Sequence, residues 1–375
     1  MRPYNADPEY YEGRAEGLLA SADDGTEGAL ATFARHGAPL TIDGARTVLA
    51  REHDFPDWAA LLDHLGRMDD DPFVRAYRAV EAHDLDALRG VLDEHPDVVR
   101  VAGTNGNDLL GMAGATCDER TVALLLERGA DVMHANVHGW TPLHQAAYSD
   151  LPVMARMLLD AGADVRAEAR GSGGTPLVVA LFWGNAGTAE LLAERGVHPR
   201  NLRTAAGLGR VEEIASAEGG ARGFYRPHGG FPAWQPSDDP QEALDEALSW
   251  AARSDRVEAL DALVARGADV AADVYRGTSL SWAAACGRVA AIRRLAELGA
   301  DVDQRTTFGG PDHGQRCTAL HLAAQSGEAE AVRALLDLGA DPWITDDLYG
   351  GNALGWAEHG GSRDVVALLR ERGVG

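Results

Sequence analysis

The clearest pattern of hydrophobic and polar positions lies between Thr318 and Pro342, in the stretch TALHLAAQSGEAEAVRALLDLGADP. The hydroxyl residue Thr318 precedes an apolar run that ends at Gly327, which predicts a short capped helix with one apolar face. A second amphipathic run ends at Gly339, a residue that permits the left-handed conformation favoured after a helix. The pattern therefore predicts two short antiparallel helices and a turn, a unit too thin to bury its own apolar face.

Related units recur along the chain at a nearly constant spacing. A Gly-Ala-Asp motif, once in a variant form at Gly196, begins at Gly129, Gly162, Gly267, Gly299 and Gly339. The first two intervals, ending at Gly162 and Gly196, are 33 and 34 residues, and Gly267 to Gly299 is 32. A period near 33 residues with a Thr-Pro-Leu-His motif, complete at Thr141–His144, is typical of ankyrin repeats.

The chain therefore resembles an ankyrin repeat protein over about 300 residues. The resemblance implies an all-α solenoid of about eight to nine repeats, in which each repeat has two helices and a short hairpin finger and buries its apolar face on its neighbours. The segment AREHDFPDWAALLDHL and the aromatic stretch FYRPHGGFPAW are similar to segments of a group of bacterial ankyrin repeat proteins without an assigned activity.

Breaks in the repeat pattern predict the organisation of the chain. The predicted parts are a flexible lead, an N-terminal helical cap, a first repeat block, a Gly/Pro/aromatic insertion and a second repeat block, at residues 1–24, 25–71, 72–217, 218–240 and 241–375. The insertion is too rich in glycine and proline to be helical. In the cap, Phe55 and Trp58 are interpreted as a cover over the first repeat, because the ends of a solenoid need one.

Charge narrows the range of partners. The chain has 34 basic and 58 acidic residues, a net charge of -24, and no lysine. This composition argues against nucleic acid and anionic membrane surfaces, which clustered cations bind, and favours a basic protein partner. The three cysteines show no paired spacing, and no segment has the length and hydrophobicity of a signal peptide or membrane span. We therefore expect a soluble cytoplasmic protein with reduced thiols.

The motifs give no support for catalysis. His144 and His321 stand in the Thr-Pro-Leu-His position, where the resemblance implies a structural role in joining neighbouring repeats. His134 and His138 are four residues apart, but they lie in a predicted finger without a third ligand, so we expect no metal. The sequence contains no zinc-protease motif, nucleophile elbow or dinucleotide fingerprint, and we expect no cofactor.

Aromatic residues provide the candidate binding surface. Tyr148, Phe182 and Trp183 fall in adjacent repeats at positions that face the concave side of ankyrin proteins, and such clusters are typical of binding hot spots. An equally good alternative is that Phe182 and Trp183 pack beneath the insertion. Trp250, Trp282 and Trp356 fall in register one position after the histidine site, where packing between first helices is the favoured interpretation.

The insertion and the finger tips supply further candidates. Polar and aromatic residues of the insertion suited to binding are Phe224, Tyr225, Arg226, His228 and Trp234, and those of the fingers are Phe308, His313 and Tyr349. The insertion either covers the apolar edge of a truncated repeat, which is the favoured interpretation, or closes a pocket as a lid. The leading hypothesis is a non-catalytic protein interaction module. The alternative is a small-molecule site or an enzyme of the isomerase or cyclase type beneath the insertion.

Overall fold

The computed structural model of the protein describes residues 7–23, 27–68, 71–103, 106–114, 118–169, 174–196, 201–217, 237–274, 277–307, 316–347 and 349–374. These residues form 22 α-helices, and their β-structure is limited to one antiparallel bridge between Thr306 and Cys317. The predicted all-α class is therefore confirmed.

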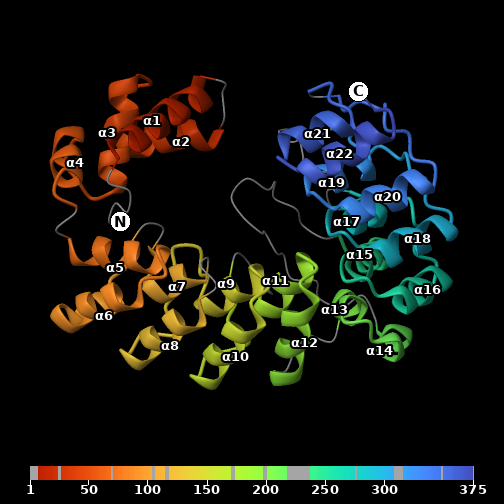
Figure 1. Cartoon of the computed structure of the whole chain (residues 1–375), viewed down its shortest axis with the longest axis horizontal. Coiled ribbons are helices and arrows are strands. Elements are labelled where there is room, and N and C mark those ends of the chain that lie inside the picture. Colours follow the sequence, from red (N-terminus) through yellow and green to blue (C-terminus); the bar gives the residue numbers. More distant parts are fainter. Residues whose placement is uncertain are drawn as a thin grey trace. The chain divides into compact units, whose positions relative to one another are not determined.

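The chain divides into two compact units. Unit 1 contains residues 1–145 and 160–163, and unit 2 contains residues 146–159 and 164–375. The division passes through two neighbouring helices, α9 (Pro142–Tyr148) and α10 (Pro152–Asp160). Figure 1 shows α1 to α8, which belong to unit 1, in red to yellow, and α11 to α22, which belong to unit 2, in green to blue.

Unit 1 begins with four helices that precede the repeats, namely α1 (Pro8–Asp23), α2 (Glu27–His36), α3 (Ile42–Glu52) and α4 (Trp58–Leu65). The last three lie within residues 25–71, the segment predicted as a helical cap. The prediction of a flexible lead over residues 1–24 is wrong for Pro8–Asp23, because this helix packs on α3 and buries Tyr11, Ala15 and Ala22. Its buried face consists mostly of alanine, which gives a weak hydrophobic signal in the sequence.

Helix α4 packs on the first repeat helix, α5 (Pro72–Glu81). Leu61 and Leu65 of α4 are buried in one cluster with Val74, which lies on the first repeat helix. Phe55 and Trp58 pack against this cluster and are partly buried. Both rings therefore close the apolar end of the repeat stack, which would otherwise face water.

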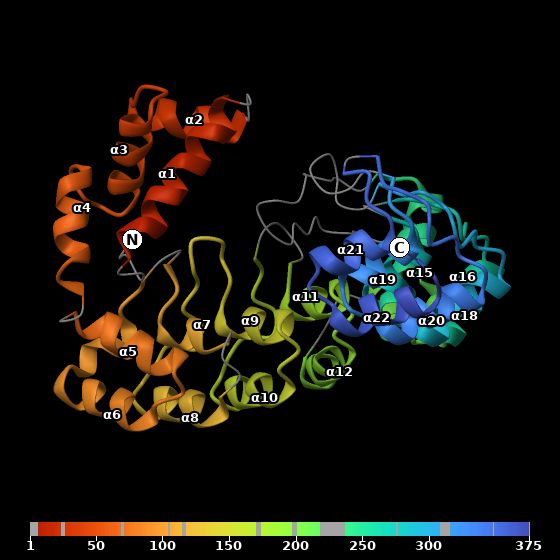
Figure 2. The ribbon, with the colours of Figure 1, turned by 45° about the horizontal axis from the view of Figure 1, so that its top comes forward.

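Two helix pairs follow in unit 1. They are α5 (Pro72–Glu81) with α6 (Leu85–Glu94), which leads into the 3₁₀ helix η2 (Pro96–Arg100), and α7 (Leu109–Ala113) with α8 (Glu119–Glu127). Figure 2 shows the first helices α5 and α7 in one row and the second helices α6 and α8 in another, and these pairs are in contact. An aspartate side chain caps the N-terminus of each of the four helices.

Unit 2 continues the same alternation. Its first helices are α11 (Pro176–Phe182), α13 (Leu202–Gly207), α15 (Pro240–Arg253), α17 (Ser279–Ala285), α19 (Ala319–Gln325) and α21 (Ala353–His359). Its second helices are α12 (Ala186–Arg195), α14 (Val211–Ser216), α16 (Val257–Ala265), α18 (Val289–Glu297), α20 (Ala329–Asp337) and α22 (Arg363–Glu371). From α5 to α22 the described residues thus form nine helix pairs, consistent with the predicted eight to nine repeats.

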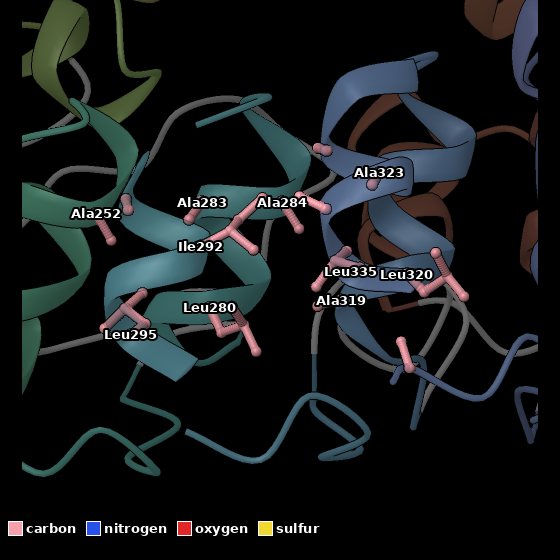
Figure 3. Close-up of a cluster of buried hydrophobic side chains, with 14 of the residues drawn as sticks. Ala252, Leu280, Ala283, Ala284, Ile292, Leu295, Ala319, Leu320, Ala323 and Leu335 are labelled. Atoms are coloured by element: carbon pink, nitrogen blue, oxygen red, sulfur yellow. The ribbon is translucent and has the colours of Figure 1, made fainter. Parts of the chain in front are cut away.

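One continuous core runs through unit 2 from α13 to α22. First helices contribute mainly alanine, such as Ala283 and Ala323, and second helices contribute larger residues, such as Ile292 and Leu335 (Figure 3). The small side chains let first helices approach closely, so each pair buries the apolar face of the next. None of the described helices is long and apolar enough to cross a membrane.

Candidate functional site

The aromatic residues predicted as a binding patch lie at the C-terminal ends of two first helices. Tyr148 is the last residue of α9, and Phe182 and Trp183 are the last residue and the C-cap of α11. Helix α11 starts at a capping threonine, Thr175, whose Oγ1 accepts a hydrogen bond from the backbone N–H of Val178 (3.4 Å). Every residue of α11 is buried, so this helix holds its C-terminal rings in fixed positions.

Phe182 is part of the core. Its side chain is 4% exposed, and its ring centroid lies 5.4 Å from that of Trp282 and 6.4 Å from that of Trp250, both in edge-to-face geometry. Such contacts stabilise the packing between α11, α15 and α17. The expectation that Phe182 offers a groove-facing anchor is therefore corrected, since its ring has almost no accessible surface.

The guanidinium of Arg253 lies among these rings. Its Cζ atom is 3.6 Å from the ring centroid of Trp282 and 4.5 Å from that of Phe182, and the residue is 1% exposed. Nη1 donates a hydrogen bond to the carbonyl oxygen of Phe182 (2.9 Å). Arg253 is thus a buried cation held by aromatic faces and a helix-terminal carbonyl. We call Phe182, Trp250, Arg253 and Trp282 the arginine cluster.

A second arginine ties the same elements together. Arg288, at the N-cap of α18, donates from Nε to the carbonyl oxygen of Arg253 (2.9 Å) and from Nη2 to that of Gly184 (2.7 Å). Gly184 has φ +74°, and a Cβ built on it would lie 2.4 Å from the Arg253 carbonyl oxygen. Glycine is therefore required where α11 meets α15. Arg288 was missed in the sequence, although its position after the loop glycine Gly287 is a usable signal.

A buried ion pair borders the cluster. Arg203 of α13 donates from Nη1 to Oε1 of Glu246 on α15 (3.2 Å), and both side chains are nearly inaccessible. The Arg203 guanidinium also lies over the ring of Trp250, with 4.9 Å between Cζ and the ring centroid. This pair could not be predicted from the sequence, because its members are 43 residues apart and lie on either side of the insertion.

Accessible aromatic surface remains at Tyr148 and Trp183, which we call the ring pair. Tyr148 is 39% exposed and Trp183 is partly buried. Their ring centroids are 5.3 Å apart at an interplanar angle of 87°, and the ring of Trp183 also contacts Phe182 (5.3 Å). The ring pair, which is partly exposed and in edge-to-face geometry, thus packs on the arginine cluster through Phe182.

The other predicted site residues do not join the ring pair among the described residues. Tyr349 lies in the finger before α21 and is 71% exposed. Trp343, in the same finger, is 53% exposed. The following candidates lie outside the described residues: Phe224, Tyr225, Arg226, His228, Trp234, Phe308 and His313. Whether the insertion acts as a lid or a cover therefore stays a prediction.

The histidine of the Thr-Pro-Leu-His position is structural in α19. His321 Nδ1 accepts a hydrogen bond from the backbone N–H of Thr318 (3.1 Å), and its Nε2 donates to the carbonyl oxygen of Gly351 in the next repeat (3.1 Å). Burial lowers the pKa of His321, which favours the neutral ring that this pattern requires. His144 accepts the equivalent bond from Thr141 (3.1 Å).

Metal-ligating side chains and thiols are the remaining groups to consider among the described residues. No three of their His, Cys, Asp or Glu side chains are placed to hold a metal ion. Burial raises the pKa of the Cys317 thiol to about 12, so this thiol is a poor nucleophile at neutral pH. The three register tryptophans Trp250, Trp282 and Trp356 are buried, which confirms their predicted packing role.

Comparison with known proteins agrees with this architecture. A model of the family described as "Ankyrin repeats (3 copies)" matches residues 76–169, 115–202 and 308–375, which together cover more than half of the chain. The chain belongs to the ankyrin repeat family. The segments that match the family model lie in both units.

Individual relatives share only parts of the chain. Human ankyrin repeat and KH domain-containing protein 1 is 41% identical over 96 residues, which are 25% of this chain and 4% of that protein. Ankyrin repeat and SAM domain-containing protein 6 of Rattus norvegicus is 33% identical over 95 residues, 25% of this chain and 11% of that protein. Protein phosphatase 1 regulatory subunit 27 of Mus musculus is 32% identical over 119 residues, 32% of this chain and 68% of that protein.

Proposed function

We propose that this ankyrin repeat protein is a non-catalytic interaction module that binds a protein partner through the ring pair, Tyr148 and Trp183. The carrying observation is that Tyr148 keeps 39% of its surface exposed while its ring rests on Trp183, and Trp183 on the arginine cluster. Tyrosine and tryptophan are the residues that most often dominate binding energy in protein interfaces.

The rigidity of the support favours binding. Phe182 beneath the pair is held in a buried helix and contacts Arg253, whose guanidinium also hydrogen-bonds the end of α11. Rings that are already fixed in the free protein lose little conformational entropy when a partner docks. A preformed aromatic surface is therefore suited to a protein ligand.

Charge and the relatives support the same class of partner. The net charge of -24 would steer a basic protein towards this chain and make association depend on salt. The mouse relative is named as a regulatory subunit of protein phosphatase 1. We accordingly propose a basic protein partner here.

Affinity capture from an extract of the native organism tests this function. Tyr148→Ala is expected to reduce the recovered partner at least about tenfold, since loss of a hot-spot ring costs about 1.4 kcal/mol or more. The matched control is Trp343→Ala, which removes an exposed ring on a finger outside the ring pair and should leave recovery unchanged. Trp183→Ala should weaken recovery too, but its partial burial adds a cost in stability.

Equal recovery by the wild type and Tyr148→Ala would overturn the proposal. A loss of recovery with Trp343→Ala alone would move the contact surface to the fingers of the last repeats. Thermal unfolding of both variants should remain close to wild type, which separates lost contacts from lost folding.

A further inference from the structure

A cavity of about 620 Å³ lies in unit 1. It is formed where the end of η2, the N-terminus of α7 and the loop after α8 come together. Its lining residues are Arg100, Asp108, Leu126, Gly129, Ala130, Asp131, Val132, His134 and Ala161. Three ionisable groups besides the arginine therefore face or border one space that could hold a small molecule or a single side chain.

Asp108 is the unusual member of this lining. It is 1% exposed, and its Oδ1 accepts the capping hydrogen bond from the backbone N–H of Gly111 (2.8 Å). Its second oxygen, Oδ2, is buried and has no hydrogen-bond partner among the described residues. A buried carboxylate oxygen without a partner is costly, so a ligand that supplies a donor would be stabilised there.

Comparison with the next repeat explains how this oxygen becomes available. In that repeat the capping residue is Thr141, whose hydroxyl lies 2.9 Å from Nδ1 of His144, three positions later. In the repeat of α7 the two positions hold Asp108 and Gly111. Two side chains that contact each other are thus replaced by a carboxylate and a glycine, which leaves one carboxylate oxygen without a side-chain partner among the described residues.

The surroundings favour a positive ligand. Asp131 lies on the same cavity, and its Oδ1 accepts a hydrogen bond from the backbone N–H of Met133 (2.9 Å). Burial raises the pKa of Asp108, the Asp131 charge raises it further, and His134 and the Gly111 bond oppose this rise. Arg100 supplies one positive charge, and its Nε is engaged with the carbonyl oxygen of Gly129 (3.1 Å). Two carboxylates therefore outnumber one guanidinium.

We propose that this cavity binds a small organic cation, a guanidinium or primary ammonium group, with Asp108 Oδ2 as the main acceptor and Asp131 as the second carboxylate. Planar or multivalent N–H donors match a buried carboxylate better than a neutral group does. Metal ions fit less well, because among the described residues no three side chains are arranged as ligands. The same chemistry can come from a free amine or from an arginine of a bound protein.

The test uses the full chain and two cationic probes, observed by calorimetry or by NMR shifts of the Gly111 amide. Agmatine represents a free cation, and arginine blocked at both ends represents a side chain of a protein. Blocked citrulline, which has the same shape without the charge, is the neutral probe. At least one cationic probe should bind, and blocked citrulline should bind at least about tenfold more weakly.

The decisive variant is Asp108→Asn, because asparagine also caps helices well and should preserve the bond to Gly111. This variant should weaken binding of the cationic probe at least about tenfold. The matched control is Asp84→Asn, which removes the same charge from the capping residue of α6, outside the cavity, and should leave binding unchanged. Binding of a cationic probe supports the proposal. Binding of agmatine indicates a free amine as the ligand, and binding of blocked arginine indicates an arginine of a bound protein.

The proposal is overturned if neither cation binds, or if Asp108→Asn and Asp84→Asn bind the probe equally. Thermal unfolding of both variants confirms that each still folds. Since the cavity lies in unit 1 and the ring pair in unit 2, Tyr148→Ala should leave probe binding unchanged. Failure here is therefore distinguishable from failure of the proposed protein interaction.

Discussion

Two regions of unit 2 differ in the side chains that hydrogen-bond to backbone carbonyl oxygens between neighbouring first helices. Between α19 and α21, a neutral histidine accepts a bond from its own capping threonine and donates to the carbonyl oxygen of Gly351. Between α11, α15 and α17, arginines reach the carbonyl oxygens of Phe182, Gly184 and Arg253 instead. One region uses an uncharged link within a regular stack, and the other a buried cation among rings.

The difference follows from what lies between the helices. In the regular stack the facing residues are alanines such as Ala319 and Ala323, which leave no room for a long polar side chain. At the junction, α11 contacts α15 as well as α13, and α13 has only six residues. Large rings and a guanidinium fill the space there. An irregular repeat is thus stabilised by a side-chain cluster that leaves two rings partly exposed.

The largest effect is expected for Arg253→Ala at the junction. Loss of a buried side chain that packs on rings and satisfies the Phe182 carbonyl should lower the free energy of unfolding by about 3–5 kcal/mol. Denaturant unfolding measures this change. The matched control, Arg333→Ala, removes a half-exposed arginine from the second helix α20 and should have little effect. Similar losses from the two variants would show that the cluster is not a core.

A smaller effect is expected for His321→Asn in the regular stack. Loss of the link to Gly351 should lower stability by about 1–2 kcal/mol at neutral pH. Since burial lowers the folded-state pKa of His321, the unfolded chain binds a proton that the folded chain does not as pH falls below about 6.5. His321 therefore contributes stability above about pH 6.5 that is lost as pH falls through its lowered pKa.

The stability of His321→Asn should depend on pH less than that of the wild type. Between pH 7.5 and pH 5, wild type should lose more stability than His321→Asn, by up to about 1.4 kcal/mol per pH unit in the titrating range. Parallel unfolding curves for the two proteins across this range would contradict a neutral histidine link.

Much of the fold could be predicted from periodicity, because each repeat carries its own capping residue, apolar face and terminal glycine. Thr318, Gly327 and Gly339 lie where the pattern requires them, and Trp250 and Trp282 are buried as expected. The arginine cluster could not be predicted in the same way. Its members come from separate repeats, and a single arginine in an apolar helix does not reveal which rings will surround it.

Helix α1 and the cavity at Asp108 show the same limit. A buried face made mainly of Ala15 and Ala22 has little hydrophobic contrast, so composition alone indicated a flexible segment. Asp108 reads as an ordinary capping residue, and only the structure reveals that one of its oxygens is buried without a partner among the described residues. Contacts across elements, which carry both features, are absent from local sequence patterns.

Site-specific photo-crosslinking tests the central claim, that the ring pair contacts a protein partner, most directly. A photoreactive phenylalanine analogue placed at position 148 should form an adduct with one protein in a native extract, and an excess of unlabelled wild type, but not of Tyr148→Ala, should suppress it. The same analogue at position 343 should give no such adduct. A specific adduct from position 343 with none from position 148 would contradict the account.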